Sequence, residues 1–517
     1  MMPRLRDPRP TVAEVVPVSR VRRAASLAAG MALVSAFAPA GLWPIAVLSP
    51  LVLITLWHDA PSPREAAILG FLFSAGTYGA GTWWLYNSLH VIGQAPVWLS
   101  ILLMLLLVAI MAAWQGLLGF VVVRWLPRDA GLANLVAVPS AWLLVEWFRG
   151  WFLSGFPWLS LGYSQTESVL RGFAPVGGVY LVSFVLLLGA AGLVTAVLGR
   201  GRARIAGLLV CVLPWPLGAL LDRVDWTRPV GAPIEVAVLQ GAVPQDEKWL
   251  SSNLDGTLAL YRRLHAAALG ARLIVWPESA PPDLANNLPR YLASIWSESR
   301  ARGSDVVMGV VRVDADGETY FNSMLALSGD EPSFYDKNHL VPFGEYFPVP
   351  RFVRQWLRLM SLPYSDFTRG GDGQPALSAG GVKIAPSICY EDAYPTEQLP
   401  ALAQSNLLVN VTNDAWFGHS GARYQHFQIA RMRAIESRRP LLRAANDGLS
   451  GLVGPRGRAY AVAPEFEPAT LRGIVQPRAG NTPWMLWANV PVVVLAASLA
   501  VLGVFVARRR RAVPVIT

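Results

Sequence analysis

The amino-acid sequence predicts a multi-pass α-helical membrane bundle of about eight spans that carries a separate α/β domain. Hydrophobic residues make up 53% of the 517 residues and charged residues only 15%, whereas soluble domains usually carry about a quarter charged residues. The apolar residues gather in eight runs, while residues 223–481 alternate short β-like and helical stretches. The 20 Trp residues exclude intrinsic disorder, and the two cysteines exclude a disulfide framework.

Most of the apolar runs are long enough to cross a bilayer, which takes about 20 apolar residues in a helix. The eight runs are residues 24–39, 43–58, 66–89, 95–122, 131–148, 176–198, 205–221 and 483–507. The first two are short and are split by Pro39, Gly41 and Pro44. They form either two spans or one re-entrant hairpin.

The distribution of arginine predicts the orientation, because cytosolic loops carry an excess of basic residues. With the N-terminus in the cytosol, 16 basic residues fall on the cytosolic side and two, Arg149 and Arg171, in the short outside loops. Seven spans then precede the α/β block, which lies outside the cytosol, and one span follows it. No cleaved signal peptide is expected in residues 1–23. The predicted organisation is a cytosolic basic tail (1–23), seven transmembrane helices (24–222), the outside domain (223–481), an eighth helix (482–507) and a basic tail (508–517).

The net charge of +10 belongs to the membrane part of the chain. Residues 223–481 hold 26 basic and 26 acidic residues, so the outside domain is neutral. A nucleic-acid partner is therefore not expected, and the cytosolic arginines are better placed to contact anionic lipid headgroups.

The outside block is expected to fold as an α/β layered domain. Strands are predicted at 233–240, 272–277, 305–312, 320–327, 382–388, 407–412 and 441–446, and helices at 251–269, 286–302 and 421–437. Polar residues follow three of these strands directly, namely Glu278, Cys389 and the pair Asn413-Asp414. Since active sites of α/β sheets gather at the carboxyl ends of strands, these residues are site candidates. The loop YDKNHLVPFGEYFP adds Lys337 and Glu345.

Lysine is scarce in this chain, with three lysines (Lys248, Lys337 and Lys383) against 41 arginines. A lysine ammonium has a pKa that shifts more readily than that of a guanidinium, which suits catalysis. Lys337 is therefore either a catalytic group or a solvated surface lysine.

Cys389 and Glu278 each have a structural alternative. A free cysteine is often a small buried hydrophobe, and Cys211, inside an apolar run, is assigned to that class. Cys389 differs because carboxylates follow it at a strand end, which favours a nucleophile. Glu278 is a candidate base, or a carboxylate at a helix N-terminus.

Two histidines, His339 and His426, are candidates for a Cys–His pair, although His339 also fits a loop cap. No metal-ligand spacing, P-loop or GxGxxG motif is present, so no metal or cofactor is expected.

At these residues the sequence resembles the nitrilase superfamily, whose members use a Glu–Lys–Cys triad. The segments GFPWLSLGYSQ, QGAVPQDEKW, YDKNHLVPFGEYFP, SICYED, NVTNDAWFG and QIARMRAIESRRPLLRAANDG narrow the resemblance to the membrane-integrated apolipoprotein N-acyltransferase family. The resemblance covers nearly the whole chain except the two tails. It implies an α-β-β-α nitrilase-like sandwich carried on the membrane bundle.

The resemblance also implies the roles of individual residues. Glu278 would be the general base, Lys337 the triad lysine and Cys389 the nucleophile. Four further positions match the family and are expected to support the site or bind substrate. They are Glu345, Tyr390, Glu391 and Trp249.

The implied reaction moves a fatty acyl chain from a phospholipid, typically phosphatidylethanolamine, to the α-amino group of an S-diacylglyceryl cysteine in an apolipoprotein. It passes through a Cys389 thioester with ping-pong kinetics, in the cytoplasmic (inner) membrane with the catalytic domain in the periplasm. Residues 352–367 mix aromatic and basic side chains, which favours a lid at the lipid interface over an ordinary amphipathic helix.

Two other functions compete with this interpretation. A membrane-anchored amidase or nitrilase would use the same triad on small amides, but a soluble substrate needs only one anchoring span. A transporter or receptor would show polar groups within its spans, whereas the main intramembrane acid here is Glu146, near a span end.

Overall fold

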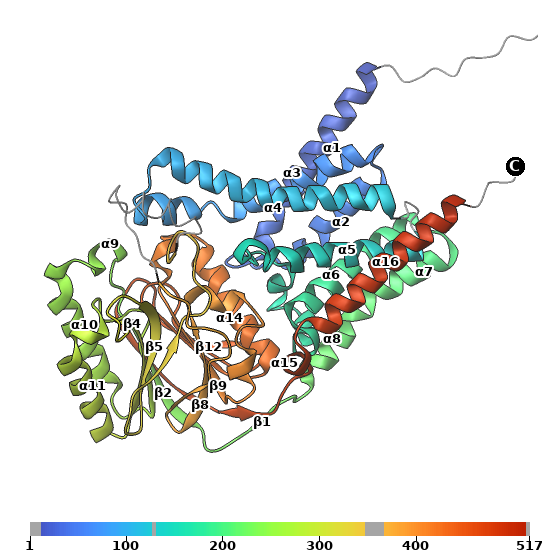
Figure 1. The fold of residues 1–517 in the computed structure, drawn as a ribbon. Helices are drawn as coiled ribbons and strands as arrows, with labels where there is room; N and C mark the ends of the chain where they lie inside the picture. The colour runs from blue at the N-terminus through green and yellow to red at the C-terminus, as the bar shows by residue number, and fades with distance from the viewer. Residues whose placement is uncertain (1–11, 127–130, 347–366, 513–517) are drawn as a thin grey trace, which may run out of the picture.

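The computed structural model describes residues 12–126, 131–346 and 367–512. Within them an α-helical bundle lies beside a domain built on two facing β-sheets (Figure 1). The bundle is formed by the N-terminal half of the chain and by the last helix, which returns from the sheet domain and packs against the bundle.

Every predicted apolar run is largely helical in the structure. The bundle helices are α1 (Val12–Leu33), α2 (Ile45–His58), α3 (Pro63–Gly81), α4 (Val97–Trp125), α5 (Leu132–Arg149), α6 (Ala174–Leu198), α7 (Gly201–Val212), α8 (Pro214–Arg223), α15 (Pro483–Trp487) and α16 (Val490–Ala512). Four helical stretches among the described residues are long and apolar enough to cross a membrane: Val97–Trp125, Val169–Leu198, Gly201–Arg223 and Val490–Arg509. The chain is thus a membrane protein with at least four candidate spans, and the count of eight stays a prediction.

The sheet domain contains two six-stranded sheets. The first has the order β13-β2-β3-β4-β5-β6, with β2 (Ile234–Gln240), β3 (Leu273–Val275), β4 (Asp305–Val313), β5 (Tyr320–Leu327), β6 (Ser333–Asp336) and β13 (Ala469–Val475). The second has the order β12-β11-β10-β9-β8-β7, with β7 (Leu377–Ala379), β8 (Val382–Ile388), β9 (Leu407–Thr412), β10 (Leu441–Ala445), β11 (Gly451–Val453) and β12 (Ala459–Val462). A separate two-stranded antiparallel sheet is formed by β1 (Arg228–Pro229) and β14 (Arg478–Ala479), near the two ends of the domain in the sequence.

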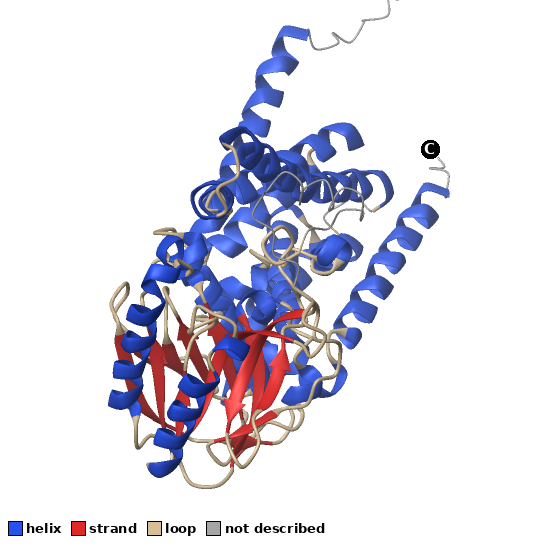
Figure 2. Cartoon of the chain, turned by 60° about the vertical axis from the view of Figure 1, so that its left-hand side comes forward, coloured by secondary structure: helices blue, strands red, loops and turns tan. Residues whose placement is uncertain are grey.

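Side-chain alternation along the strands produces four layers. Val236 and Val238 of β2 point into an apolar core shared with Ile384 and Val409 of the other sheet. The residues between them on β2, among them Ala237, point outward beneath the outer helices. The outer layers are α10 (Leu254–Ala268) with α11 (Pro289–Ala301) on one side and α14 (Ala422–Ser437) on the other (Figure 2). The predicted α-β-β-α arrangement is confirmed.

Helix α14 is also the main contact between the sheet domain and the bundle. It packs against α6, where the Glu436 carboxylate accepts a hydrogen bond of 2.7 Å from the backbone N–H of Val179. The indole N–H of the buried Trp158 donates to Gln425 Oε1 at 2.7 Å. The second sheet is therefore fixed to the membrane bundle through buried polar contacts.

Candidate active site

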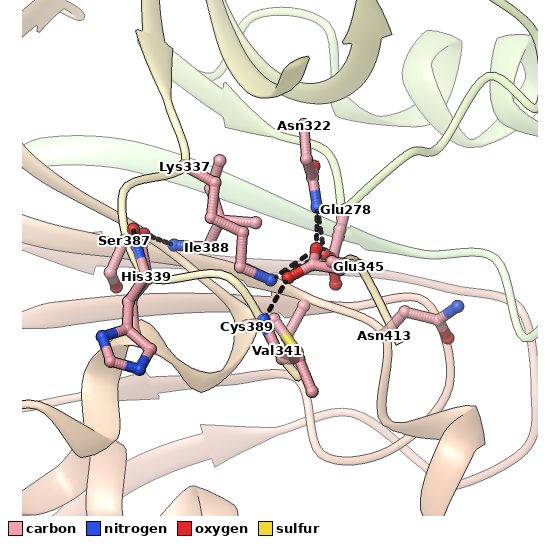
Figure 3. A network of polar contacts seen from close by, with 12 residues as sticks. Glu278, Asn322, Lys337, His339, Val341, Glu345, Ser387, Ile388, Cys389 and Asn413 are labelled. Atoms are coloured by element: carbon pink, nitrogen blue, oxygen red, sulfur yellow. Dashed lines mark hydrogen bonds and ion pairs between the residues drawn. The ribbon is translucent and has the colours of Figure 1, made fainter. Parts of the chain in front are cut away.

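Three of the predicted site residues follow strands, and the two facing sheets bring them together. Glu278 comes shortly after β3, Lys337 directly after β6 and Cys389 directly after β8. Glu345 lies in the loop after Lys337 and points back at it (Figure 3). The first sheet thus supplies the carboxylate and the ammonium, and the second sheet supplies the thiol.

Lys337 sits between the two carboxylates. Its Nζ lies 2.8 Å from Glu345 Oε1 and 3.7 Å from Glu278 Oε1, and its side chain is only 1% exposed. The short contact with Glu345 is a hydrogen-bonded ion pair, while the contact with Glu278 is longer. Glu345 is therefore the main counter-ion of the lysine.

Asn322 of β5 joins the same two carboxylates and was not identified from the sequence. Its Nδ2 donates to Glu278 Oε1 at 2.8 Å and to Glu345 Oε1 at 2.9 Å. One amide group thus bridges two acidic side chains that would otherwise repel each other. The only signal in the sequence is one asparagine inside an apolar strand, YFNSMLAL, where a buried amide needs partners.

The surroundings keep Lys337 protonated. Burial on its own would lower the pKa of the Lys337 ammonium, but the carboxylates of Glu345 and Glu278 outweigh burial and raise it well above the usual range. This ammonium is a fixed positive charge beside the thiol.

The Cys389 backbone lies in the left-handed region, with φ of 54°, immediately after β8. Such a conformation is costly for a residue with a side chain, so it persists only where surrounding contacts impose it. The carbonyl oxygen of Cys389 accepts from Asn410 Nδ2 at 3.3 Å and lies 3.3 Å from His426 Nε2. These contacts hold the turn that presents the thiol.

The thiol of Cys389 is neutral in the resting site. Burial among protein groups raises its pKa well above the usual range, the Glu278 charge raises it further, and the Lys337 ammonium opposes both. The charge of Lys337 favours the thiolate, but burial outweighs the lysine. A base must therefore remove the proton when the thiol reacts.

Glu391 connects the cysteine turn to the lysine loop. Its carboxylate is buried and accepts from the backbone N–H groups of Ile388 at 2.7 Å, Asn338 at 2.6 Å and His339 at 3.1 Å. Ile388 precedes the cysteine, and Asn338 and His339 follow the lysine. The carboxylate therefore fixes the separation of Cys389 and Lys337.

The other predicted residues lie around this centre. Tyr390 packs its ring near Trp158 and Tyr394. Trp249 is half exposed. His339 stacks on Tyr394 and pairs through Nδ1 with Glu397 Oε1 at 2.7 Å.

His426 does not pair with the thiol. It lies between Asp392 and Asp414 and approaches the backbone oxygen of Cys389. The Cys–His alternative is therefore not supported for either histidine.

The predicted lid, residues 352–367, lies almost wholly outside the described residues.

Comparison with known proteins gives two family matches that together cover most of the chain. The model described as "Apolipoprotein N-acyltransferase N-terminal domain" matches residues 29–192, and the model described as "Carbon-nitrogen hydrolase" matches residues 235–482. The second match spans the two facing sheets, so the expected nitrilase-like fold is confirmed.

Several curated relatives match over nearly their whole length, and each is named apolipoprotein N-acyltransferase. The protein of Methylococcus capsulatus is 42% identical over 94% of this chain and 96% of its own. The protein of Pseudomonas putida is 42% identical over 92% and 94%, and that of Azotobacter vinelandii 43% over 95% and 96%.

Two solved structures match about half of the chain. The NitFhit protein of C. elegans has a TM-score of 0.38 and 16% identity, covering 48% of this chain and 61% of its own. An amidase of the nitrilase superfamily from Nesterenkonia has a TM-score of 0.36 and 19% identity, covering 51% and 97%.

Proposed function

The chain belongs to the apolipoprotein N-acyltransferase family, and from this premise we propose that it transfers a fatty acyl chain from a membrane phospholipid to the α-amino group of an S-diacylglyceryl cysteine in an apolipoprotein. Phosphatidylethanolamine is the expected donor. The observation that carries the proposal is the cluster of Glu278, Lys337 and Glu345 beside Cys389, with Glu278 and Lys337 buried, on a chain with candidate membrane-spanning helices. This would be the last step of bacterial lipoprotein maturation.

In the first half-reaction, Glu278 removes the proton of the neutral Cys389 thiol as the sulfur attacks the ester carbonyl carbon of the phospholipid. The C=O electron pair moves to oxygen, and the Lys337 ammonium with backbone N–H groups stabilises the oxyanion. Losing one such donor typically costs about 2.7–4 kcal/mol of barrier. When the intermediate collapses, the ester C–O bond breaks and Glu278 returns the proton to the lysophospholipid alkoxide. A thioester remains on Cys389.

In the second half-reaction, the α-amino group of the lipoprotein attacks the thioester carbonyl carbon. Glu278 takes a proton from the attacking amine, and the C–S bond breaks to release the Cys389 thiolate. The proton held by Glu278 then returns to the sulfur, which restores the resting thiol. Because the donor product leaves before the acceptor reacts, the kinetics are ping-pong.

The remaining matched residues have supporting roles in this proposal. Glu345 keeps Lys337 charged through the 2.8 Å ion pair. Glu391 fixes the Cys389 turn against the Lys337 loop. Tyr390 packs behind the nucleophile, and the exposed Trp249 is available to contact substrate.

The proposed location is the cytoplasmic (inner) membrane, with eight spans, both termini in the cytosol and the sheet domain in the periplasm. The support is the 16-to-2 distribution of basic residues between the two sides. This placement puts the thiol outside the cytosol, where diacylglyceryl lipoproteins are displayed after export. In this proposal the sheet domain comprises residues 223–481. Seven transmembrane helices lie within residues 24–222, and the eighth is formed by residues 482–507.

The test is to weigh the intact enzyme after incubation with phosphatidylethanolamine in detergent micelles. The wild type should gain one fatty-acyl mass that maps to Cys389 and is removed by hydroxylamine. Cys211→Ala, which removes the only other cysteine, should keep the adduct, whereas Cys389→Ala and Glu278→Gln should lose it. If the wild type carries no such adduct, the proposed mechanism is wrong.

The acceptor is tested with two lipopeptides that differ only at the amine. Acyl-enzyme should transfer its chain to a diacylglyceryl lipopeptide with a free α-amine and not to the N-acetylated lipopeptide. Release of ammonia from small amides without transfer would identify an amidase instead. Uptake of solute that persists in Cys389→Ala would identify a transporter.

A further inference from the structure

Lys248 is a buried lysine to which the proposed reaction assigns no role. Its side chain is 1% exposed, whereas the third lysine, Lys383, lies on the surface and contacts Ser378. Lysine is rarely buried without a carboxylate partner. Among the described residues no carboxylate forms an ion pair with Lys248, so its burial requires another explanation.

The Lys248 ammonium binds the backbone of the proposed base. Its Nζ donates to the carbonyl oxygen of Glu278 at 3.2 Å. The peptide groups on either side of Glu278 are bound to β4, since Gly309 N–H donates to the Pro277 oxygen at 3.2 Å and Ala280 N–H to the Gly309 oxygen at 3.1 Å. The carbonyl oxygen of Glu278, which lies between these two groups in the chain, accepts its hydrogen bond from Lys248.

The turn itself is held in an unfavourable conformation. Ser279, the residue after Glu278, has a φ of 46°, in the left-handed region. Gly309 lies so close beneath the turn that an added Cβ would approach the Glu278 Cα to 2.5 Å. A turn under such constraints depends on the contacts that hold it, and Lys248 provides one of them through its hydrogen bond to the Glu278 carbonyl oxygen.

The short helix that carries Lys248, α9 (Gln245–Lys248), is fixed at its other end as well. Gln245 Oε1 accepts from Asn413 Nδ2 at 2.5 Å, and Asn413 Oδ1 accepts from Asn446 Nδ2 at 3.2 Å. Asn413 follows β9 of the second sheet. Helix α9 therefore links the Glu278 turn of one sheet to the second sheet that carries the nucleophile.

Charge gives Lys248 a second effect on the base. Burial lowers the pKa of Lys248 to about 8, and the negative charge of Glu278 opposes that shift. The Lys248 ammonium thus places a positive charge close enough to interact with the Glu278 carboxylate. The other charged or titratable groups at Glu278 are Lys337, Glu345 and, across the site, Cys389.

We infer that Lys248 is a positioning residue for the general base, which holds the Glu278 turn through its carbonyl oxygen. The inference rests on the proposed role of Glu278. It gives a role to Lys248, one of the three lysines of the chain, and accounts for the burial of its side chain next to the exposed Trp249.

The experiment follows formation of the Cys389 acyl-enzyme from phosphatidylethanolamine between pH 5 and 10 in four proteins: wild type, Lys248→Met, Lys248→Arg and Lys383→Met. Lys248→Met keeps the aliphatic stem and removes both donor and charge. Lys248→Arg keeps a charge and donors that do not titrate in this range. Lys383→Met is the matched surface control and should behave as wild type.

We expect Lys248→Met to react about 10- to 100-fold more slowly at pH 7, because the base is misplaced. The wild-type rate should fall as the pH rises through about 8, where Lys248 loses its proton. Lys248→Arg should recover most of the rate and lack that alkaline fall.

A wild-type rate in Lys248→Met at pH 7, or an unchanged alkaline limb in Lys248→Arg, overturns the inference. The comparison of the alkaline limbs of the wild type and Lys248→Arg remains decisive even if Lys248→Met fails to fold. Absence of acyl-enzyme in the wild type refutes the proposed function instead, so the two failures are distinguishable.

Discussion

A buried charge cluster beneath the nucleophile makes the stability of the protein dependent on alkaline pH. His426 lies 3.0 Å from Asp392 Oδ1 through Nε2 and 2.8 Å from Asp414 Oδ1 through Nδ1. Arg443 reaches the same two carboxylates at 3.0 Å each. With His426 protonated, two positive and two negative charges balance in a site that water does not enter.

The size of the stability loss at alkaline pH follows from the pKa of His426. Burial and the Arg443 guanidinium, 2.9 Å from Nδ1, disfavour the imidazolium, but the carboxylates of Asp392 and Asp414 outweigh both and raise this pKa from 6.5 to about 9. A histidine with a raised pKa stabilises the fold fully below about pH 6.5 and loses that contribution as the pH rises through 9. Each pKa unit corresponds to about 1.4 kcal/mol, so roughly 3 kcal/mol is lost across this window.

The assay is thermal unfolding of the detergent-solubilised protein from pH 6 to pH 10. The unfolding midpoint of the wild type should fall by roughly 6–12 °C, using about 2–4 °C per kcal/mol for a domain of this size. His426→Gln should be less stable at pH 6 and lack most of this fall. Subtracting the two curves removes groups common to both, such as Lys248.

His265→Gln is the matched control, because His265 is also a buried histidine but burial lowers its pKa to about 4. It is neutral throughout the window, so its replacement should leave the alkaline slope unchanged. A wild-type slope in His426→Gln would refute the reasoning, since the imidazolium could not then be its source.

Two further substitutions test the contacts that hold the site. Asn322→Leu should slow formation of the acyl-enzyme by about 100-fold, because it removes two hydrogen bonds to carboxylates that contribute about 1.5–3 kcal/mol each; a wild-type rate in the mass assay would reject this bridging role. Glu391→Gln should lower the free energy of unfolding by about 2 kcal/mol and slow acylation, since its amide sets an N–H donor against the backbone N–H groups of Ile388, Asn338 or His339. An unchanged unfolding midpoint would show that the carboxylate is not needed there.

The fold was predictable where the hydrophobic pattern was strong. The strands predicted at 320–327, 382–388 and 407–412 match β5, β8 and β9 to the residue, because each is a buried run bounded by polar or turn residues. The edge strands β6, β7, β12 and β13 were missed. Strands β6, β7 and β12 have only three or four residues, and β13 is longer but mostly half-buried or exposed, so the stability of these strands comes from pairing with a neighbour.

The candidate site was predictable where polar residues follow apolar strands, as Glu278 and Cys389 do. Lys337 was singled out by the scarcity of lysine and by its loop, and Glu345 by the same loop and the family motif. Asn322 and the relation of Lys248 to Glu278 were not predictable, because both depend on how two sheets and a short helix come together in space. The sequence singled out Lys248 as rare, but it could not indicate that its partner is a backbone oxygen 30 residues away.

The proposed chemistry suits this site because the total charge of the site does not change during acylation. In the resting state Glu278 and Glu345 are negative, Lys337 is positive and the thiol is neutral, which gives a net charge of minus one. Transfer of the thiol proton to Glu278 moves that charge to sulfur, and attack moves it to the carbonyl oxygen. A buried site tolerates such internal movement far better than the entry of a new charge.

This scheme requires Glu278 to be free to accept a proton, and the geometry of Lys337 provides for that. The ammonium makes its short contact with Glu345 at 2.8 Å and stays 3.7 Å from Glu278. Had the short ion pair formed with Glu278, protonation of the base would break it and add to the barrier. Glu345 therefore keeps the lysine charged, while Glu278 accepts and returns the proton. The Asn322 amide holds both carboxylates in place during this proton transfer.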